Sequence, residues 1–125
     1  MGTRVLPGVA DVVLGEDGIL RILHHVGTSV DGERARQISA VHAELAAGRQ
    51  LPTLIDISGI RSADRASREI AAGMEDSIER LAVVVSGPVS AVIGNFFLRV
   101  TRPRYETRIF ASIGAAERWL LRGEP

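Results

Sequence analysis

Apolar residues gather along the chain in short runs, separated by stretches in which they recur at helical spacing. The first two runs, 9–14 and 19–23, flank an Asp-Gly pair, and Asp-Gly between two apolar runs is typical of a β-hairpin. Three later runs have the length of buried strands and lie at 51–57, 81–85 and 107–111. The pattern predicts five strands, the first two of them antiparallel.

Four amphipathic stretches alternate with the later strands. Their apolar residues recur every three or four positions, and this spacing places them on one face of a helix. The four stretches are 31–48, 63–74, 88–100 and 113–123. Pro88 suits the beginning of the third helix, because proline is favoured at the first helical position.

The predicted order of elements is β-β-α-β-α-β-α-β-α. Strands that alternate with helices form a largely parallel sheet covered by helices, and the opening hairpin makes the sheet mixed. We therefore expect an α/β fold with a single-layer, mixed and mostly parallel five-stranded sheet covered by four helices. A chain of 125 residues has the size of one domain, so residues 1–125 are expected to form a single domain with an ordered core at about 9–122.

Charge and cysteine content exclude several classes of protein. The fifteen basic residues are all arginine and are balanced by fifteen acids, so no overall positive field attracts nucleic acid. Cysteine is absent, which removes disulfides, thiolate nucleophiles and thiolate metal sites. No apolar run approaches the ~20 residues that span a bilayer. We expect a cytoplasmic protein without a membrane span, a nucleic-acid partner or a cofactor.

The histidines and serines form no recognisable catalytic motif. His24 and His25 are adjacent at a strand end and therefore point to opposite faces, while His42 falls on the apolar face of the first helix. No serine lies in a Gly-x-Ser-x-Gly elbow, and no glycine-rich phosphate loop is present. We expect the protein not to be an enzyme. An enzyme that uses the serines at the strand ends, with His24 or His25 as base, stays open as an alternative.

The segment 54–68 is the most specific polar feature of the sequence. A buried strand runs into a turn with serines, at the sheet edge where α/β folds bind ligands, although the same hydroxyls also suit helix capping alone. In the following helix Asp64 suits the positive charge of the first turn, whereas Arg65 and Arg68 oppose it. The two arginines either mark a contact surface or pair with nearby acids. The candidate partner- or anion-binding residues are Ser58, Ser62, Asp64, Arg65, Ser67 and Arg68.

At this segment the chain resembles the STAS family, the sulfate-transporter and anti-sigma-factor-antagonist domains. Residues 54–60, Leu-Ile-Asp-Ile-Ser-Gly-Ile, are similar to the strand and turn of that family, and Asp64 matches the aspartate that opens its Asp-Ser-Ser-Gly-Leu motif. Ala66 occupies the position of the family's phosphorylated serine, so no phosphorylation switch is expected there. The likeness is closer to small uncharacterised bacterial proteins with this SpoIIAA-like fold and extends over about residues 10–121. It implies the fold and assigns no reaction.

Two functions stay open. The first is a non-enzymatic regulatory or interaction domain that binds a protein or a small anion at the start of the second helix, with isologous pairing of two copies into a homodimer. The second is a small-molecule or lipid-binding domain with an apolar pocket under the helices. Met74, Phe96, Phe97 and Trp119 would line that pocket, or would simply fill the core.

Overall fold

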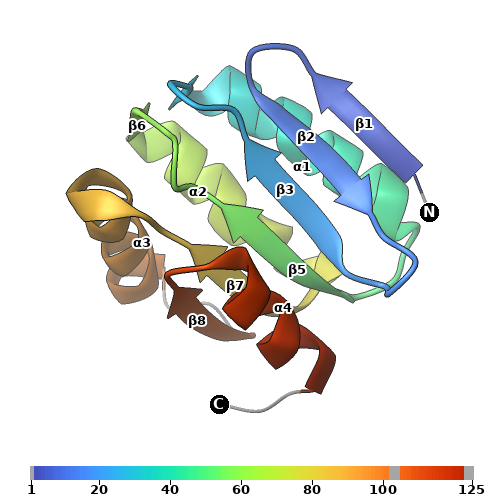
Figure 1. Ribbon diagram of the computed structural model, residues 1–125. Helices are drawn as coiled ribbons and strands as arrows, with labels where there is room; N and C mark the ends of the chain where they lie inside the picture. Colours follow the sequence, from blue (N-terminus) through green and yellow to red (C-terminus); the bar gives the residue numbers. More distant parts are fainter. Residues whose placement is uncertain (1, 102–104, 123–125) are drawn as a thin grey trace.

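The main sheet of the protein has six strands (Figure 1). The computed structural model describes residues 2–101 and 105–122. In their order across the sheet, the strands are β1 (Gly2–Leu6), β2 (Ala10–Leu14), β3 (Leu20–His24), β5 (Leu51–Asp56), β7 (Ile78–Val84) and β8 (Glu106–Phe110). The last four of these are parallel, whereas β2 is antiparallel to both β1 and β3.

Helices cover both faces of the sheet. On one face lie α1 (Gly32–Ala46), α2 (Arg65–Ala72) and α3 (Gly87–Thr101), and on the other lies α4 (Ile113–Arg122). A 3₁₀ helix, η1 (Gly73–Ser77), continues the chain from α2 to β7. A mixed, mostly parallel sheet with four α-helices confirms the predicted fold class.

The strand count differs from the prediction. The sheet begins with the edge strand β1, which was not predicted. Its three central residues are exposed, so its sequence shows no alternation of apolar and polar residues. Two short strands, β4 (Ser29–Val30) and β6 (Ser62–Ala63), pair in parallel as a separate two-stranded sheet. Strands of two residues are too short to leave a periodic signal in the sequence.

The Asp-Gly hairpin predicted from the sequence is confirmed, and an aspartate also caps the first helix. The hairpin between β2 and β3 turns at Asp17 and Gly18, and Gly18 has a φ of +83°, which favours glycine. The backbone N–H of Ile19 donates to Asp17 Oδ1 at 3.1 Å and tightens this turn. Asp31 caps α1 by accepting from the backbone N–H of Arg34 at 2.9 Å.

The sheet divides the apolar core into two clusters. Because successive strand residues point to opposite faces, Leu81 and Val83 of β7 join the cluster under α1, α2 and α3. Ala82 and Val84 join the cluster under α4, together with Trp119. All four β7 residues are buried, which confirms the prediction of a strand covered on both faces.

Candidate functional site

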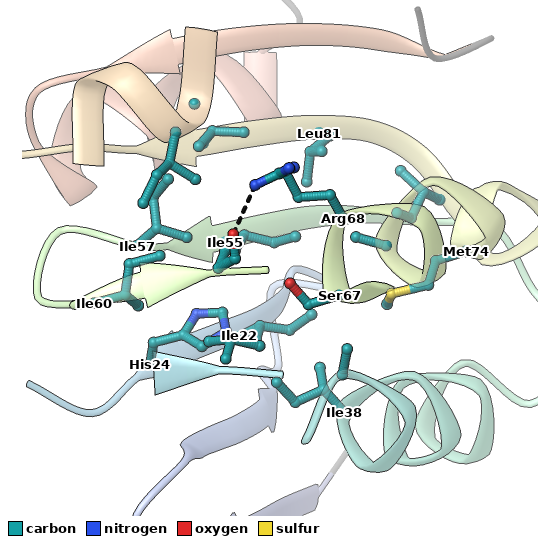
Figure 2. Close-up of a pocket in the computed structure, with 18 of the residues that line it drawn as sticks. Ile22, His24, Ile38, Ile55, Ile57, Ile60, Ser67, Arg68, Met74 and Leu81 are labelled. Carbon is teal, nitrogen blue, oxygen red and sulfur yellow. Dashed lines mark hydrogen bonds between the residues drawn. The ribbon is translucent and has the colours of Figure 1, made fainter. Parts of the chain in front are cut away.

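A cavity of about 110 Å³ lies between the sheet and the helices α1, α2 and α3 (Figure 2). Its floor is formed by side chains that point to one face of three parallel strands, namely Ile22 of β3, Ile55 of β5 and Leu81 of β7. Ile38 of α1 and Met74 of η1 close the sides. The cavity is therefore part of the larger apolar core, left open where side chains do not meet.

Small residues on the surrounding elements explain why a space remains. Ala35 of α1, Ala71 of α2 and Gly94 of α3 all line the cavity, and none of them reaches across it. A side chain of isoleucine size at any of these positions would occupy part of the space. Protein interiors are otherwise packed as densely as organic crystals, so a cavity of this size is a distinct feature of the fold.

The two-stranded sheet β4–β6 closes one end of the cavity. Val30 of β4 and Ala63 of β6 line it, and so does Ile60 in the loop between β5 and β6. The loops that carry these strands are joined by backbone hydrogen bonds, with Gly27 N–H donating to the carbonyl of Gly59 at 2.7 Å. The carboxyl ends of β3 and β5 are thus covered by chain from two separate segments.

Polar groups reach the cavity from β3 and α2. His24 Nδ1 lies 3.1 Å from the carbonyl oxygen of Asp56, and since a carbonyl only accepts, Nδ1 carries the proton of the neutral ring. Burial lowers the pKa of His24 below the usual value for histidine, although the Asp56 carbonyl opposes this shift. The neutral ring therefore leaves Nε2 as an acceptor. Ser67 Oγ donates to the carbonyl of Asp64 at 2.8 Å, and Arg68 Nη1 donates to the carbonyl of Ala63 at 2.7 Å.

The structure divides the six predicted site residues into two groups. Ser67 and Arg68 line the cavity, and Ser67 is only 4% exposed. Asp64 is the N-cap of α2 and accepts from the backbone N–H of Ser67 at 2.8 Å. Arg65 is exposed and forms an ion pair with Glu69 at 3.0 Å. For this arginine, the second of the two alternatives given by the sequence, pairing with a nearby acid, is the one observed.

The two predicted serines of the turn lie apart from the cavity. The backbone N–H of Ser58 donates to Asp56 Oδ1 at 2.9 Å, and Ser62 is exposed on β6. The sequence named His24 only as a base of the alternative enzyme, and it did not select the small residues of the helices that line the cavity. The feature of the sequence that pointed to His24 is its place at the end of a strand, next to His25.

The residues predicted to line a pocket have different positions. Met74 lines the cavity, as expected. Trp119 lies on the opposite face of the sheet beside Phe110, so its assignment to the pocket is wrong. The side chains of Phe96 and Phe97 lie outside the described part of the structure.

The histidines form hydrogen bonds with groups other than serine. His25 Nε2 lies 2.9 Å from Asp11 Oδ1, and His42 Nε2 lies 3.4 Å from Thr53 Oγ1. Within residues 2–101 and 105–122, no three histidine or carboxylate side chains gather as metal ligands. In the same part of the chain, no helix is both long enough and apolar enough to cross a membrane.

Comparison with solved structures identifies the fold. An uncharacterised protein of the DUF3478 family from Shewanella loihica PV-4, with a SpoIIAA-like fold, is similar to this chain with a TM-score of 0.63 and 17% identity over 96% of this chain and 99% of that one. This likeness confirms the SpoIIAA-like fold that the sequence resemblance implied. A protein of unknown function from Arthrobacter sp. FB24 shares 27% identity over 87% of this chain and 90% of that one, with a TM-score of 0.35.

Comparison of sequences identifies the family but no activity. No curated protein matches the chain. The model of a domain of unknown function, DUF7793, matches residues 13–123. Since this match covers most of the sequence, the chain belongs to the DUF7793 family.

Proposed function

We propose that this protein is a non-enzymatic domain that binds a small, largely apolar molecule in the cavity under α1, α2 and α3. The observation that carries the proposal is the cavity of about 110 Å³, whose lining surface is almost entirely apolar and consists mostly of aliphatic side chains. An apolar cavity in a protein stays dry and takes up apolar molecules, and an engineered cavity of about 150 Å³ binds benzene. The same physical preference favours an apolar occupant here.

The size of the cavity limits the occupant. Pockets for drug-sized ligands have volumes of roughly 300 to 1,000 Å³, so a whole phospholipid or a large cofactor does not fit within this one. The volume favours the part of a molecule that contains about four to six carbon atoms. A binding role without catalysis is supported by the hydrogen bond of the serine at the cavity, because Ser67 Oγ donates its proton to the backbone carbonyl of Asp64.

Benzene titration followed by methyl-resolved NMR tests this function. We expect the methyl resonances of Ile22, Ile55 and Leu81 to shift as benzene is added and to reach a plateau, because these side chains line the cavity. The methyl groups of Leu54 and Leu120, in the cluster under α4, are expected to remain unchanged.

Two substitutions sharpen the benzene experiment. Ala71→Leu places a larger side chain into the cavity and is expected to weaken benzene binding at least tenfold, while the thermal stability is kept. Ala43→Leu, at an exposed position of α1, is the matched control and should bind benzene as the wild type does. If benzene shifts both clusters equally, or none of the methyl groups, the cavity is not a binding site.

A second candidate function, the interaction domain, is favoured by one observation at the surface. Val26 is 91% exposed and lies in the loop between β3 and β4, outside the predicted contact segment. The N–H of Gly27 in this loop donates to the carbonyl of Gly59, which belongs to that segment. Single exposed apolar residues are common, and it is the position of Val26 beside Gly59 of the predicted segment that favours a contact surface here. We infer a homodimer formed through this loop. The cytoplasmic location and the absence of a nucleic-acid partner stay predictions.

Sedimentation velocity tests the homodimer. The wild type is expected to be dimeric at tens of micromolar, and Val26→Ser is expected to shift it to monomer by removing apolar contact area from the interface. Val5→Ser, at an exposed valine of the edge strand β1, is the control that should stay dimeric. A wild type that stays monomeric at high concentration contradicts the dimer, and so does dissociation caused by Val5→Ser alone.

A further inference from the structure

We propose that the open half of one sheet face, over β1, β2 and β3 and beside α4, binds an amphipathic helix of a partner protein. The partner helix carries basic residues on both sides of its apolar stripe. This surface goes beyond the proposed binding of an apolar molecule, because the cavity lies on the opposite face of the sheet, under α1, α2 and α3. The proposal is carried by the apolar and the acidic side chains that the open half presents together.

In the part of the chain that the structure describes, this half of the sheet face has no helix over it. α1, α2 and α3 lie on the opposite face, and α4 packs on β5, β7 and β8 (Figure 1). The strands β1, β2 and β3 span about 10 Å, because neighbouring strands lie about 4.8 Å apart. Packed helices lie about 8–10 Å apart, so the open half has room for one more helix beside α4.

Apolar side chains occupy part of the open half. Val12 and Ile22 belong to the cluster under α1, so Val13 and Leu23, which follow them, point to the other face. Val5 of β1 points the same way and is more than half exposed. Antiparallel strands with one face in water usually place polar residues on that face, so these apolar residues favour a surface that a partner covers.

The neighbouring flank of α4 adds apolar surface to the open half. Glu117 accepts from Arg21 Nε and Nη2 of β3 at 2.9 and 2.7 Å, so the flank of α4 that carries Glu117 faces β3. Residues four positions apart share a helix flank, and Ile113 and Leu121 therefore lie on it as well. Ile113, Leu121 and Val5 are three of the six large apolar residues that are exposed in the described chain. Exposed apolar surface is thus concentrated around the open half.

Carboxylates lie on both sides of the apolar residue at the centre of this surface. The register places Leu23 between Asp11 of β2 and Asp56 of β5. The carboxylate of Asp11 is partly exposed, and its Oδ1 lies 2.9 Å from His25 Nε2. A carboxylate accepts several hydrogen bonds, so a basic side chain of the partner can bond to Asp11 beside His25.

The charge of the open half selects a basic partner. The charged side chains that point to this face from β1, β2, β3 and β5, or bond to them from neighbouring segments, are four acids, one arginine and one histidine, namely Asp11, Asp17, Asp56, Glu117, Arg21 and His25. The acids are in excess even when the histidine is counted as a cation. An amphipathic helix with basic residues beside its apolar stripe therefore matches both the apolar surface and the charge.

Titration with two synthetic helical peptides tests the proposal, because the peptides share an apolar stripe and differ in charge. In the first, leucines recur every three or four positions and the other residues are lysine, and in the second glutamate replaces lysine. We expect the leucine–lysine peptide to shift the methyl resonances of Val5, Val13 and Leu23, while those of Ile38 and Ile55 in the cavity remain unchanged. The leucine–glutamate peptide should bind at least tenfold more weakly, because the acids of the open half repel it.

Two variants with matched controls place the peptide on this surface. Asp11→Asn should weaken binding of the leucine–lysine peptide about two- to fivefold, the effect of a partly exposed ion pair, whereas Glu33→Gln, at an exposed acid of α1, should leave it unchanged. Leu121→Ala should weaken binding roughly tenfold through lost apolar contact, whereas Val92→Ala, at an exposed valine of α3, should leave it unchanged. Thermal melts establish that all four variants are folded.

Three results would overturn the proposal, namely no binding of the leucine–lysine peptide, equal binding of the two peptides, or wild-type affinity in both Asp11→Asn and Leu121→Ala. A second copy of the chain as occupant is recognised by sedimentation velocity without peptide. In that case Leu121→Ala would dissociate a wild-type dimer, and the partner helix would again be ruled out. Benzene binding in the cavity is independent of all these results, because the cavity lies on the opposite face of the sheet.

Discussion

Lowering the pH from 7 to 5 is expected to reduce the free energy of unfolding by about 2 kcal/mol, mainly through His42. This side chain is 1% exposed on the face of α1 that packs on the sheet. Burial lowers its pKa from 6.5 to about 4. Between these two values the unfolded chain binds a proton that the folded chain does not, so stability falls as the pH drops through this window. For a chain of this length the loss corresponds to a decrease in Tm of roughly 8 °C.

Burial favours the neutral form of His42, and Thr53 provides the one described hydrogen-bond partner of the neutral ring. Thr53 Oγ1 donates to the carbonyl of Leu51 at 3.0 Å, so towards His42 Nε2, which is 3.4 Å away, it acts as an acceptor. The ring can thus donate one hydrogen bond while uncharged. Protonation of the ring would bury a full positive charge among aliphatic side chains, and this costs free energy because no carboxylate of the described chain pairs with it.

Thermal melts between pH 5 and 7 measure the effect. His42→Leu removes the titrating group and should flatten most of the pH dependence, with a residual slope of the same sign from His24, whose pKa is also lowered by burial. Ala43→Leu, at an exposed position of the same helix without a titrating group, is the control that should keep the wild-type profile. The bond from Arg21 lowers the pKa of Asp17, but this contribution is lost only in the acidic range below about pH 4. An unchanged profile in His42→Leu would contradict the assignment.

The parts of the fold that depend on local chemistry were predictable from the sequence. The turn at Asp17 and Gly18 needs a positive φ, and the strand β7 is apolar at successive positions because both of its faces are covered. β1 could not be predicted in the same way, because the three central residues of this edge strand are exposed and show no apolar alternation. The β4–β6 pair depends on loops 32 residues apart meeting in space, as Gly27 and Gly59 do.

The candidate site was predictable only as a segment. The turn and helix start at 54–68 were singled out by their charges, and two of the selected residues, Ser67 and Arg68, line the cavity. The cavity itself results from small side chains on three helices that face one another, such as Ala35 and Ala71. Helical periodicity reveals that a face is buried, but it does not reveal whether the facing side chains fill the space between them.

The same limitation explains why Trp119 was assigned to the wrong face, and it leads to the largest expected effect on stability. The helical spacing of apolar residues predicts that one face of the helix packs on the sheet. It does not predict which side of the sheet the helix covers. Trp119 is 3% exposed under α4, with its ring centroid 5.6 Å from that of Phe110 and the guanidinium carbon of Arg80 5.2 Å above its ring. Arg80 also donates to the carbonyls of Trp119 and Leu120, which ties the end of α4 to β7.

Trp119→Ala is therefore expected to lower the free energy of unfolding by about 3 to 5 kcal/mol, measured by urea denaturation followed by far-UV circular dichroism. Trp119→Phe keeps an aromatic ring against Phe110 and should lose less, while Leu121→Ala, at a 57% exposed neighbour, should lose little. Because the sheet separates Trp119 from the cavity, the folded Trp119→Phe variant should bind benzene as the wild type does. A loss below 1 kcal/mol in Trp119→Ala would mean that α4 is not held by this contact. A large loss of benzene affinity in Trp119→Phe would mean that the two faces are coupled, and that the cavity depends on packing across the whole sheet.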